Sequence, residues 1–66
     1  MLLQQLITFA RVVELGSFTR AGELLNLSQP AVTRQVAALE REFGTPLVER
    51  AGRKIAVTPA GQVVYG

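Results

Sequence analysis

The stretch "LLNLSQPAVTRQVAALE", residues 24–40, has the pattern of one helix ending, a tight turn and another helix beginning. Asn26-Leu27-Ser28 forms the predicted turn, and the apolar Leu27 is expected to fill its corner. Ser28 is suited to cap the next helix, and Pro30 falls in the first turn of that helix, where its missing N–H costs no hydrogen bond. The sequence therefore predicts two helices joined at a short turn, as in a helix-turn-helix.

Apolar residues recur at helical spacing throughout residues 2–43, which predicts three helices. Gly16 and Gly44 are suited to end the first and third, and Ser17 is suited to cap the second. Gly22 lies inside the second helix at a cost of about 1 kcal/mol relative to alanine; we interpret it as allowing close approach of another helix, the alternative being a tolerated weakness. The predicted core-facing residues are Leu3, Leu6, Ile7, Ala10 and Val13 of the first helix, with Phe9 and Val12 widening the stripe, Phe18, Ala21, Leu24 and Leu25 of the second, and Val32, Val36, Leu39 and Phe43 of the third.

Two short strands, residues 46–50 and 54–57, are predicted after the helices, joined at Ala51-Gly52-Arg53. Thr58-Pro59 has the pattern of a cap and a first helical position, so a fourth helix is expected to start at Pro59 and to run for two turns. The predicted fold is mainly α: a winged helix-turn-helix over residues 1–58, made of a three-helix core and a β-hairpin wing, followed by the start of a further helix over residues 59–66.

The composition limits what the chain can do. With 66 residues it is one small domain, and with neither cysteine nor histidine it has no disulfide and no thiolate or imidazole metal ligand. A catalyst would need Glu, Ser, Thr, Lys or Tyr65, and no arrangement of these pairs a nucleophile with a base. We therefore expect no enzyme, no catalytic residue, no metal and no cofactor. We also see no signal peptide and no membrane span.

Polar side chains occupy the predicted outward face of the third helix. At about 100° per residue, the side opposite the apolar stripe carries Pro30, Thr33, Arg34, Ala37 and Arg41, with Gln29 at its edge. Gln can pair with adenine and Arg with guanine, and Thr can donate or accept a hydrogen bond or contact a thymine methyl. An ordinary solvated face would also account for these residues, but the preceding turn favours base readout.

Positive charge is densest at the predicted hairpin. Arg50, Arg53 and Lys54 lie within five positions of one another in a chain of net charge +2. Such a tip can contact phosphates or insert an arginine into a narrow minor groove. The alternative is that the charges protect an edge hairpin from aggregation; its position after a helix-turn-helix favours DNA contact.

A family resemblance covers nearly the whole chain. "GSFTRAGELLNLSQPAVTRQVAALEREFGTPLVER", residues 16–50, followed by "VTPAG", residues 57–61, resembles the DNA-binding domain of LysR-type transcriptional regulators. The resemblance implies a bacterial, cytoplasmic regulator that binds double-stranded DNA sequence-specifically, with the third helix in the major groove and the wing on the adjacent backbone or minor groove. The implied contacts are Ser28, Gln29, Pro30, Thr33 and Arg34 on the reading helix, Arg50, Arg53 and Lys54 on the wing, and Ser17, Thr19 and Arg20 at the DNA backbone.

The resemblance also implies partners. Residues 59–66 match the start of the linker helix through which the family dimerises, so we expect a homodimer or tetramer for a full-length protein. We expect this chain to be monomeric or weakly dimeric, to lack the effector ligand site and to have no membrane partner. It departs from the family pattern at Gly22, usually alanine, Thr33, more commonly serine, and Val48, commonly phenylalanine. The alternative function is a helix-turn-helix protein-interaction module without specific DNA readout.

Overall fold

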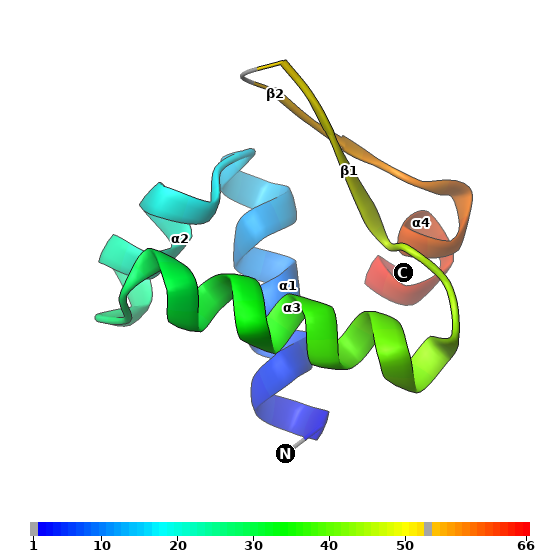
Figure 1. Cartoon of the computed structure of the whole chain (residues 1–66), viewed down its shortest axis with the longest axis horizontal. Coiled ribbons are helices and arrows are strands. Elements are labelled where there is room, and N and C mark those ends of the chain that lie inside the picture. The colour runs from blue at the N-terminus through cyan, green and yellow to red at the C-terminus, as the bar shows by residue number, and fades with distance from the viewer. Residues whose placement is uncertain (1, 53) are drawn as a thin grey trace.

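Residues 2–52 and 54–66, the part of the chain that the computed structural model describes, form helices and one antiparallel hairpin (Figure 1). None of these helices is both long and apolar enough to cross a membrane. The arrangement confirms a mainly α winged helix-turn-helix. Its elements are α1 (Leu2–Leu15), α2 (Phe18–Leu25), α3 (Gln29–Phe43), β1 (Val48–Ala51), β2 (Lys54–Val57) and α4 (Pro59–Tyr65).

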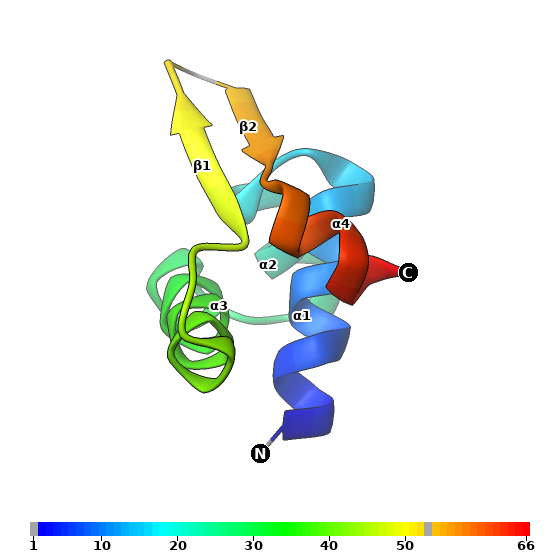
Figure 2. The same ribbon diagram turned by 90° about the vertical axis from the view of Figure 1, so that its right-hand side faces the viewer.

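The tip of the hairpin projects beyond the helices, and α4 returns beside α1 (Figure 2). The two strands pair in antiparallel register from Val48 opposite Val57 to Ala51 opposite Lys54. This layout leaves α3 on one side of the molecule and α4 on another, with α1 between them (Figure 2).

Helix α1 buries only part of the wide apolar stripe that its periodicity predicted. Phe9 and Val12 are 1% and 0% exposed, whereas Leu3 and Ile7 are 65% and 37% exposed. The prediction that Leu3 and Ile7 face the core is wrong, because α1 carries more apolar residues than its neighbours cover. Helices α2 and α3 contact the side that holds Phe9 and Val12, so only this side is buried.

Helix α2 begins and ends as its sequence predicts. Its N-cap Ser17 has extended backbone, and the Ser17 hydroxyl accepts a hydrogen bond from the Arg20 N–H at 3.1 Å. Asn26 ends the helix in the left-handed conformation, with φ 60°.

Leu24 is 61% exposed, so its assignment to the core is wrong: among the described residues, no neighbouring element covers the side of α2 from which it projects.

Gly22 is in close contact with the turn that follows it. A Cβ at this position would lie 2.6 Å from the Leu27 carbonyl oxygen and 3.4 Å from a methyl group of Val32 on α3. The close-approach interpretation of Gly22 is therefore confirmed, although its nearest partner is the backbone of the turn. The small residue lets the turn fold tightly and seats α3 against α2.

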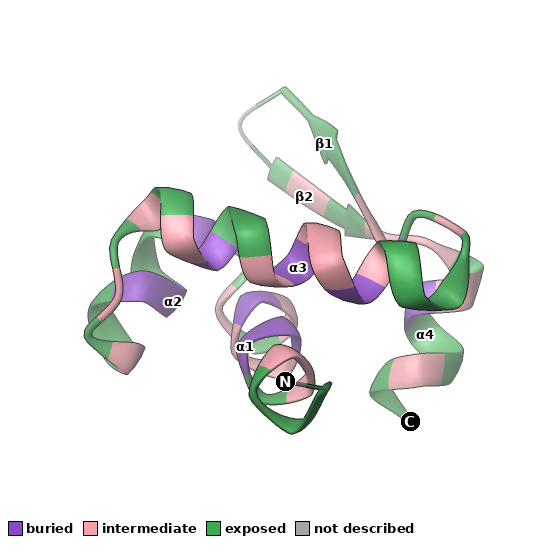
Figure 3. Cartoon of the chain, turned by 60° about the horizontal axis from the view of Figure 1, so that its bottom comes forward, coloured by how far each residue is buried: buried purple, intermediate pink, exposed green. Residues whose placement is uncertain are grey.

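Helix α3 supplies the centre of the core. Val32, Val36 and Leu39 are between 0% and 2% exposed, as their spacing predicts. Phe43 is 48% exposed, which contradicts its predicted place in the core. The last turn of α3 extends past the point where α1 crosses it (Figure 3), and Phe43 belongs to neither core cluster of the described residues.

The first strand begins two residues later than predicted. Leu47 is fully buried, in one cluster with Phe9 and Leu39. The Glu40 carboxylate accepts hydrogen bonds from the Leu47 N–H at 2.8 Å and from the Val48 N–H at 3.3 Å. Residues 46–47 therefore anchor the wing to α3 instead of pairing with the second strand, and β1 starts only at Val48.

Helix α4 starts at Pro59, as predicted, and its cap also fastens the wing. The Thr58 hydroxyl accepts a hydrogen bond from the Gly61 N–H at 3.0 Å and donates one to the Pro46 carbonyl at 2.7 Å. The Thr58 N–H donates to the Leu47 carbonyl at 3.1 Å. One threonine thus ties the start of α4 to the segment that leads into the hairpin.

Candidate nucleic-acid interface

The outward face of α3 carries the predicted reading residues. Pro30, Thr33 and Arg34 are exposed, and Gln29 is half-buried at the first position of the helix. The Ser28 hydroxyl accepts a hydrogen bond from the Ala31 N–H at 3.2 Å, and its own proton remains able to donate. The N-terminal half of α3 therefore presents hydroxyl, amide and guanidinium groups together.

Gln35 turns to the other side of α3. Although it directly follows Arg34 in the sequence, its side-chain oxygen accepts a hydrogen bond from the hydroxyl of Thr8, which is fully buried on α1. A buried hydroxyl without a partner would be costly, so this contact satisfies Thr8 and helps to hold α3 on α1. Helical periodicity did not predict this contact, because it placed only apolar residues of these two helices in the core.

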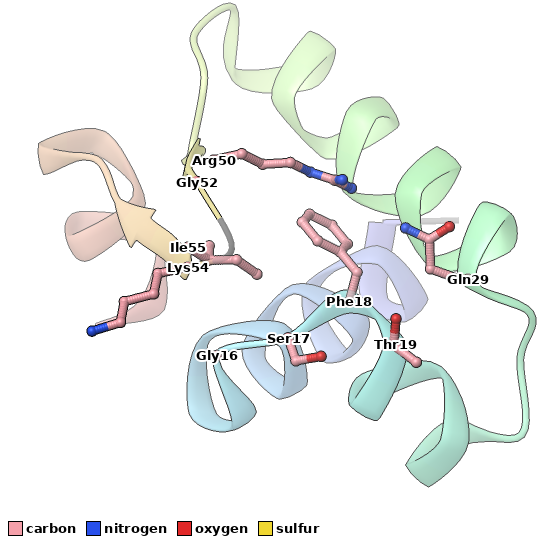
Figure 4. Close-up of a pocket in the computed structure, with 9 residues that line it drawn as sticks. All are labelled: Gly16, Ser17, Phe18, Thr19, Gln29, Arg50, Gly52, Lys54 and Ile55. Atoms are coloured by element: carbon pink, nitrogen blue, oxygen red, sulfur yellow. The ribbon is translucent and has the colours of Figure 1, made fainter.

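A groove joins the three segments in which DNA contacts were predicted. It has a volume of about 280 Å³ and lies between the start of α2, the start of α3 and the wing (Figure 4). Among the predicted contact residues, the fold brings Ser17, Thr19, Gln29, Arg50 and Lys54 to one place, although they span residues 17–54 of the sequence. The full lining is Gly16, Ser17, Phe18, Thr19, Gln29, Arg50, Gly52, Lys54 and Ile55.

Arg50 stacks on an aromatic ring within this groove. The centre of its guanidinium lies 4.6 Å from the centroid of the Phe18 ring, a distance within the range of cation–π attraction. The arginine side chain extends across the ring towards α3, whereas Lys54 points away from it (Figure 4). Phe18 was predicted in the core and Arg50 on the wing, and both are so placed. Nothing in the sequence signals that these two residues meet.

The other predicted contact residues lie around the groove. Arg20 is exposed in the first turn of α2, next to Thr19, which lines the groove. Arg34 and Thr33 lie further along α3 and do not line the groove. Arg53, predicted on the wing, lies outside the described residues.

Comparison with known proteins assigns the chain to a family. A family model described as "Bacterial regulatory helix-turn-helix protein, lysR family" matches residues 3–62. The chain belongs to the LysR family. Its relatives in this family include the RuBisCO operon transcriptional regulator of Allochromatium vinosum, 49% identical over 63 residues, which covers 96% of this chain and 21% of that protein.

Solved structures of LysR-family domains have the same fold. The BenM DNA-binding domain, crystallised with catB site 1 DNA, superposes with a TM-score of 0.92 at 43% identity, covering 98% of this chain and 72% of that one. The CbnR DNA-binding domain, crystallised with DNA, gives a TM-score of 0.92 at 42% identity, covering 98% and 75%. The chain spans about a fifth of the length of three of the curated relatives that it matches.

Proposed function

We propose that this LysR-family domain binds double-stranded DNA sequence-specifically, with α3 in the major groove and the wing on the adjacent backbone or minor groove. The observation that carries the proposal is the convergence of the α2 start, the α3 start and the wing on one groove that is lined with hydrogen-bonding and cationic side chains (Figure 4). The likeness to the BenM and CbnR domains, both crystallised with DNA, supports it.

The side chains on this face divide into two roles in the proposal. Those that can read base edges are Gln29, Thr33 and Arg34, because they project from the half of α3 nearest the groove. Those that hold the backbone are short hydroxyls and cations, which contact phosphates without reading sequence. The proposed backbone contacts are Ser17, Thr19, Arg20 and Ser28, the proposed wing contacts are Arg50, Arg53 and Lys54, and Pro30 packs against the DNA.

The proposal extends to the whole protein. Residues 1–58 would form the DNA-binding unit, and residues 59–66 the start of a linker helix through which two or four copies associate. We infer that the protein acts in the cytoplasm as a regulator and not as an enzyme, in keeping with its relatives, which are transcriptional regulators.

Selection of bound sequences from a random duplex pool tests this function, using the domain fused to a dimerising helix so that two half-sites are read together. We expect an enriched, interrupted palindrome and binding that weakens steeply as salt rises. In the selected duplex, Arg34→Ala should weaken binding by about 1–3 kcal/mol if Arg34 reads a base. Arg41→Ala, which removes the same charge from an exposed site in the last turn of α3, is the matched control and should have a smaller effect.

A pool without an enriched motif, together with binding that salt barely changes, would overturn specific DNA recognition. The same result would favour a protein-interaction module, for which the exposed Leu3 and Ile7 on α1 supply an apolar surface.

A further inference from the structure

We propose that Phe18 is a positioning residue for Arg50: its ring holds the guanidinium of the wing arginine over the groove before DNA arrives. This inference rests on the proposed DNA-binding function and adds to it a residue that touches no base or phosphate itself. It joins two elements that are far apart in sequence, the first residue of α2 and the middle of β1.

Phe18 is held firmly enough to serve as a platform. It is 8% exposed and belongs to a core cluster with Val12, Ala21, Val32 and Val36. The ring also lines the groove, where the Arg50 guanidinium lies over it (Figure 4). The same ring therefore packs in the core and supports the arginine.

Arg50 is a long, exposed side chain on a two-stranded hairpin, where it would otherwise sample many rotamers. Its partner in the strand register is Ile55, which packs against the same core cluster as Phe18. Packing of Ile55 thus keeps the backbone at Arg50 near the Phe18 ring. The cation–π contact at 4.6 Å then orients the Arg50 side chain.

The N–H groups of the Arg50 guanidinium remain available to donate hydrogen bonds while it is stacked on Phe18. Within the described residues no carboxylate lies within ion-pairing distance of Arg50, whereas Arg11 is paired with Glu14. A ring contacts the flat face of the guanidinium and leaves its N–H groups at the edge available. Arg50 can therefore donate to a phosphate or a base edge without giving up the stack, and its order in the free protein lowers the entropy lost on binding.

The alternative is that the contact is only packing, in which the arginine shields an otherwise exposed aromatic edge. The two roles differ in one respect. If Phe18 positions Arg50, replacing Phe18 lowers DNA affinity only when Arg50 is present. If the contact is only packing, replacing Phe18 lowers stability, and the DNA affinity of the folded protein does not depend on the contact between Phe18 and Arg50.

A double-mutant cycle with the selected duplex tests the inference, using Phe18→Leu, Arg50→Ala and the double variant. Binding is measured at a temperature where circular dichroism shows every variant folded. We expect Phe18→Leu to weaken binding by about 2- to 5-fold when Arg50 is present, and to have no further effect in the Arg50→Ala background. Val36→Ala, in the same core cluster but outside the groove, is the control; it should lower stability and leave the affinity unchanged.

A second measurement needs no variant to fold and no DNA. In the NMR spectrum of the free wild-type domain, the side-chain protons of Arg50 should be shifted upfield by the Phe18 ring. Unshifted Arg50 protons would overturn the inference, as would a Phe18→Leu effect of equal size with and without Arg50. A wild-type domain that binds no duplex at all would overturn the proposed function, and this inference with it. That result differs from failure of the inference alone, in which the wild-type domain binds DNA but the Phe18→Leu effect does not depend on Arg50.

Discussion

The three-helix core and the wing are held together by different kinds of contact. Buried residues gather where α1, α2 and α3 meet, while the hairpin is exposed or half-buried along its whole described length (Figure 3). Phe9, Val12 and Leu39 are 0–1% exposed. The wing is held by the buried Leu47, by the half-buried Val48 and Ile55, and by hydrogen bonds. The Leu47 N–H donates to Glu40, and Thr58 donates to the Pro46 and Leu47 carbonyls.

The difference between these contacts explains how the domain combines a firmly fixed α3 with a wing that is less strongly held. Apolar burial contributes roughly 1.5–3 kcal/mol for each large side chain, so many contacts together fix the position of α3. A hydrogen bond contributes about 1 kcal/mol net, and the wing has only a few. We therefore expect the wing to open locally at a lower free energy than the core.

The largest expected effect comes from a cavity in the core. Leu39→Ala removes a fully buried side chain between α1 and α3 and should lower the free energy of unfolding by about 2–5 kcal/mol. In so small a domain this can abolish folding, which urea titration followed by circular dichroism would show. Leu24→Ala makes the same change at a site that is 61% exposed and should change stability far less; equal losses would contradict the assigned core.

The next effect concerns the junction between the wing and α4. In Gly61→Ala the new Cβ would lie 2.1 Å from the Leu47 carbonyl oxygen, so the backbone must shift. We expect a loss of about 1–3 kcal/mol, measured by thermal unfolding, and faster amide exchange at Thr58, whose N–H donates to that carbonyl. Gln62→Ala alters an exposed neighbour on the same helix and should leave both readouts near their wild-type values.

A smaller effect is expected at the polar anchor of the wing. Glu40→Ala removes the acceptor of the Leu47 and Val48 N–H groups and should cost about 1–2 kcal/mol. Amide exchange should rise at these two positions more than in the centre of α3. Glu42→Ala removes the same charge from an exposed site two residues along and serves as the control; an equal rise in exchange there would count against a specific anchor.

The smallest effect is expected where α4 meets α1. The Tyr65 hydroxyl donates to the Glu14 carboxylate at 3.1 Å, and this hydrogen bond raises the pKa of Tyr65 above its ordinary value of 10.0. Because the pKa in the folded state is the higher one, the contribution of this contact is complete below pH 10 and is lost as the pH rises through the folded value.

Tyr65→Phe should therefore flatten the fall of stability with pH in the alkaline range and change stability little at neutral pH. Thermal unfolding followed across the range from neutral to strongly alkaline pH measures this. An unchanged alkaline slope in the variant would show that Tyr65 does not contribute through Glu14.

Much of the helical core could be predicted from local sequence patterns. Ser17, Ser28 and Thr58 each cap the helix that their positions predict, and Gly44 ends α3. These signals are reliable because a cap needs only the residue itself and the next three along the chain. The outward placement of Thr33 and Arg34 followed equally well from the helical period, because the opposite side of the same helix carries Val32, Val36 and Leu39.

The errors arose where a helix carries more apolar surface than its neighbours cover. Leu3 and Ile7 on α1, Leu24 on α2 and Phe43 on α3 all fit the helical period and are all exposed. Periodicity identifies apolar rows, but it does not say which row a neighbouring helix covers. Likewise, Leu47 has the pattern of a strand residue. In the fold, however, its N–H donates to Glu40 and its side chain is buried in the core.

Local sequence patterns are enough to predict the order of the elements, their caps, and the residue types on the outward half of α3, because each depends on contacts within a few residues. Packing between the elements settles which apolar rows are buried, how Glu40 and Thr58 fasten the wing, and that Arg50 meets Phe18. Those outcomes depend on groups 7 to 32 residues apart in the chain. Their proximity is set by how the helices pack against one another, which no local pattern records.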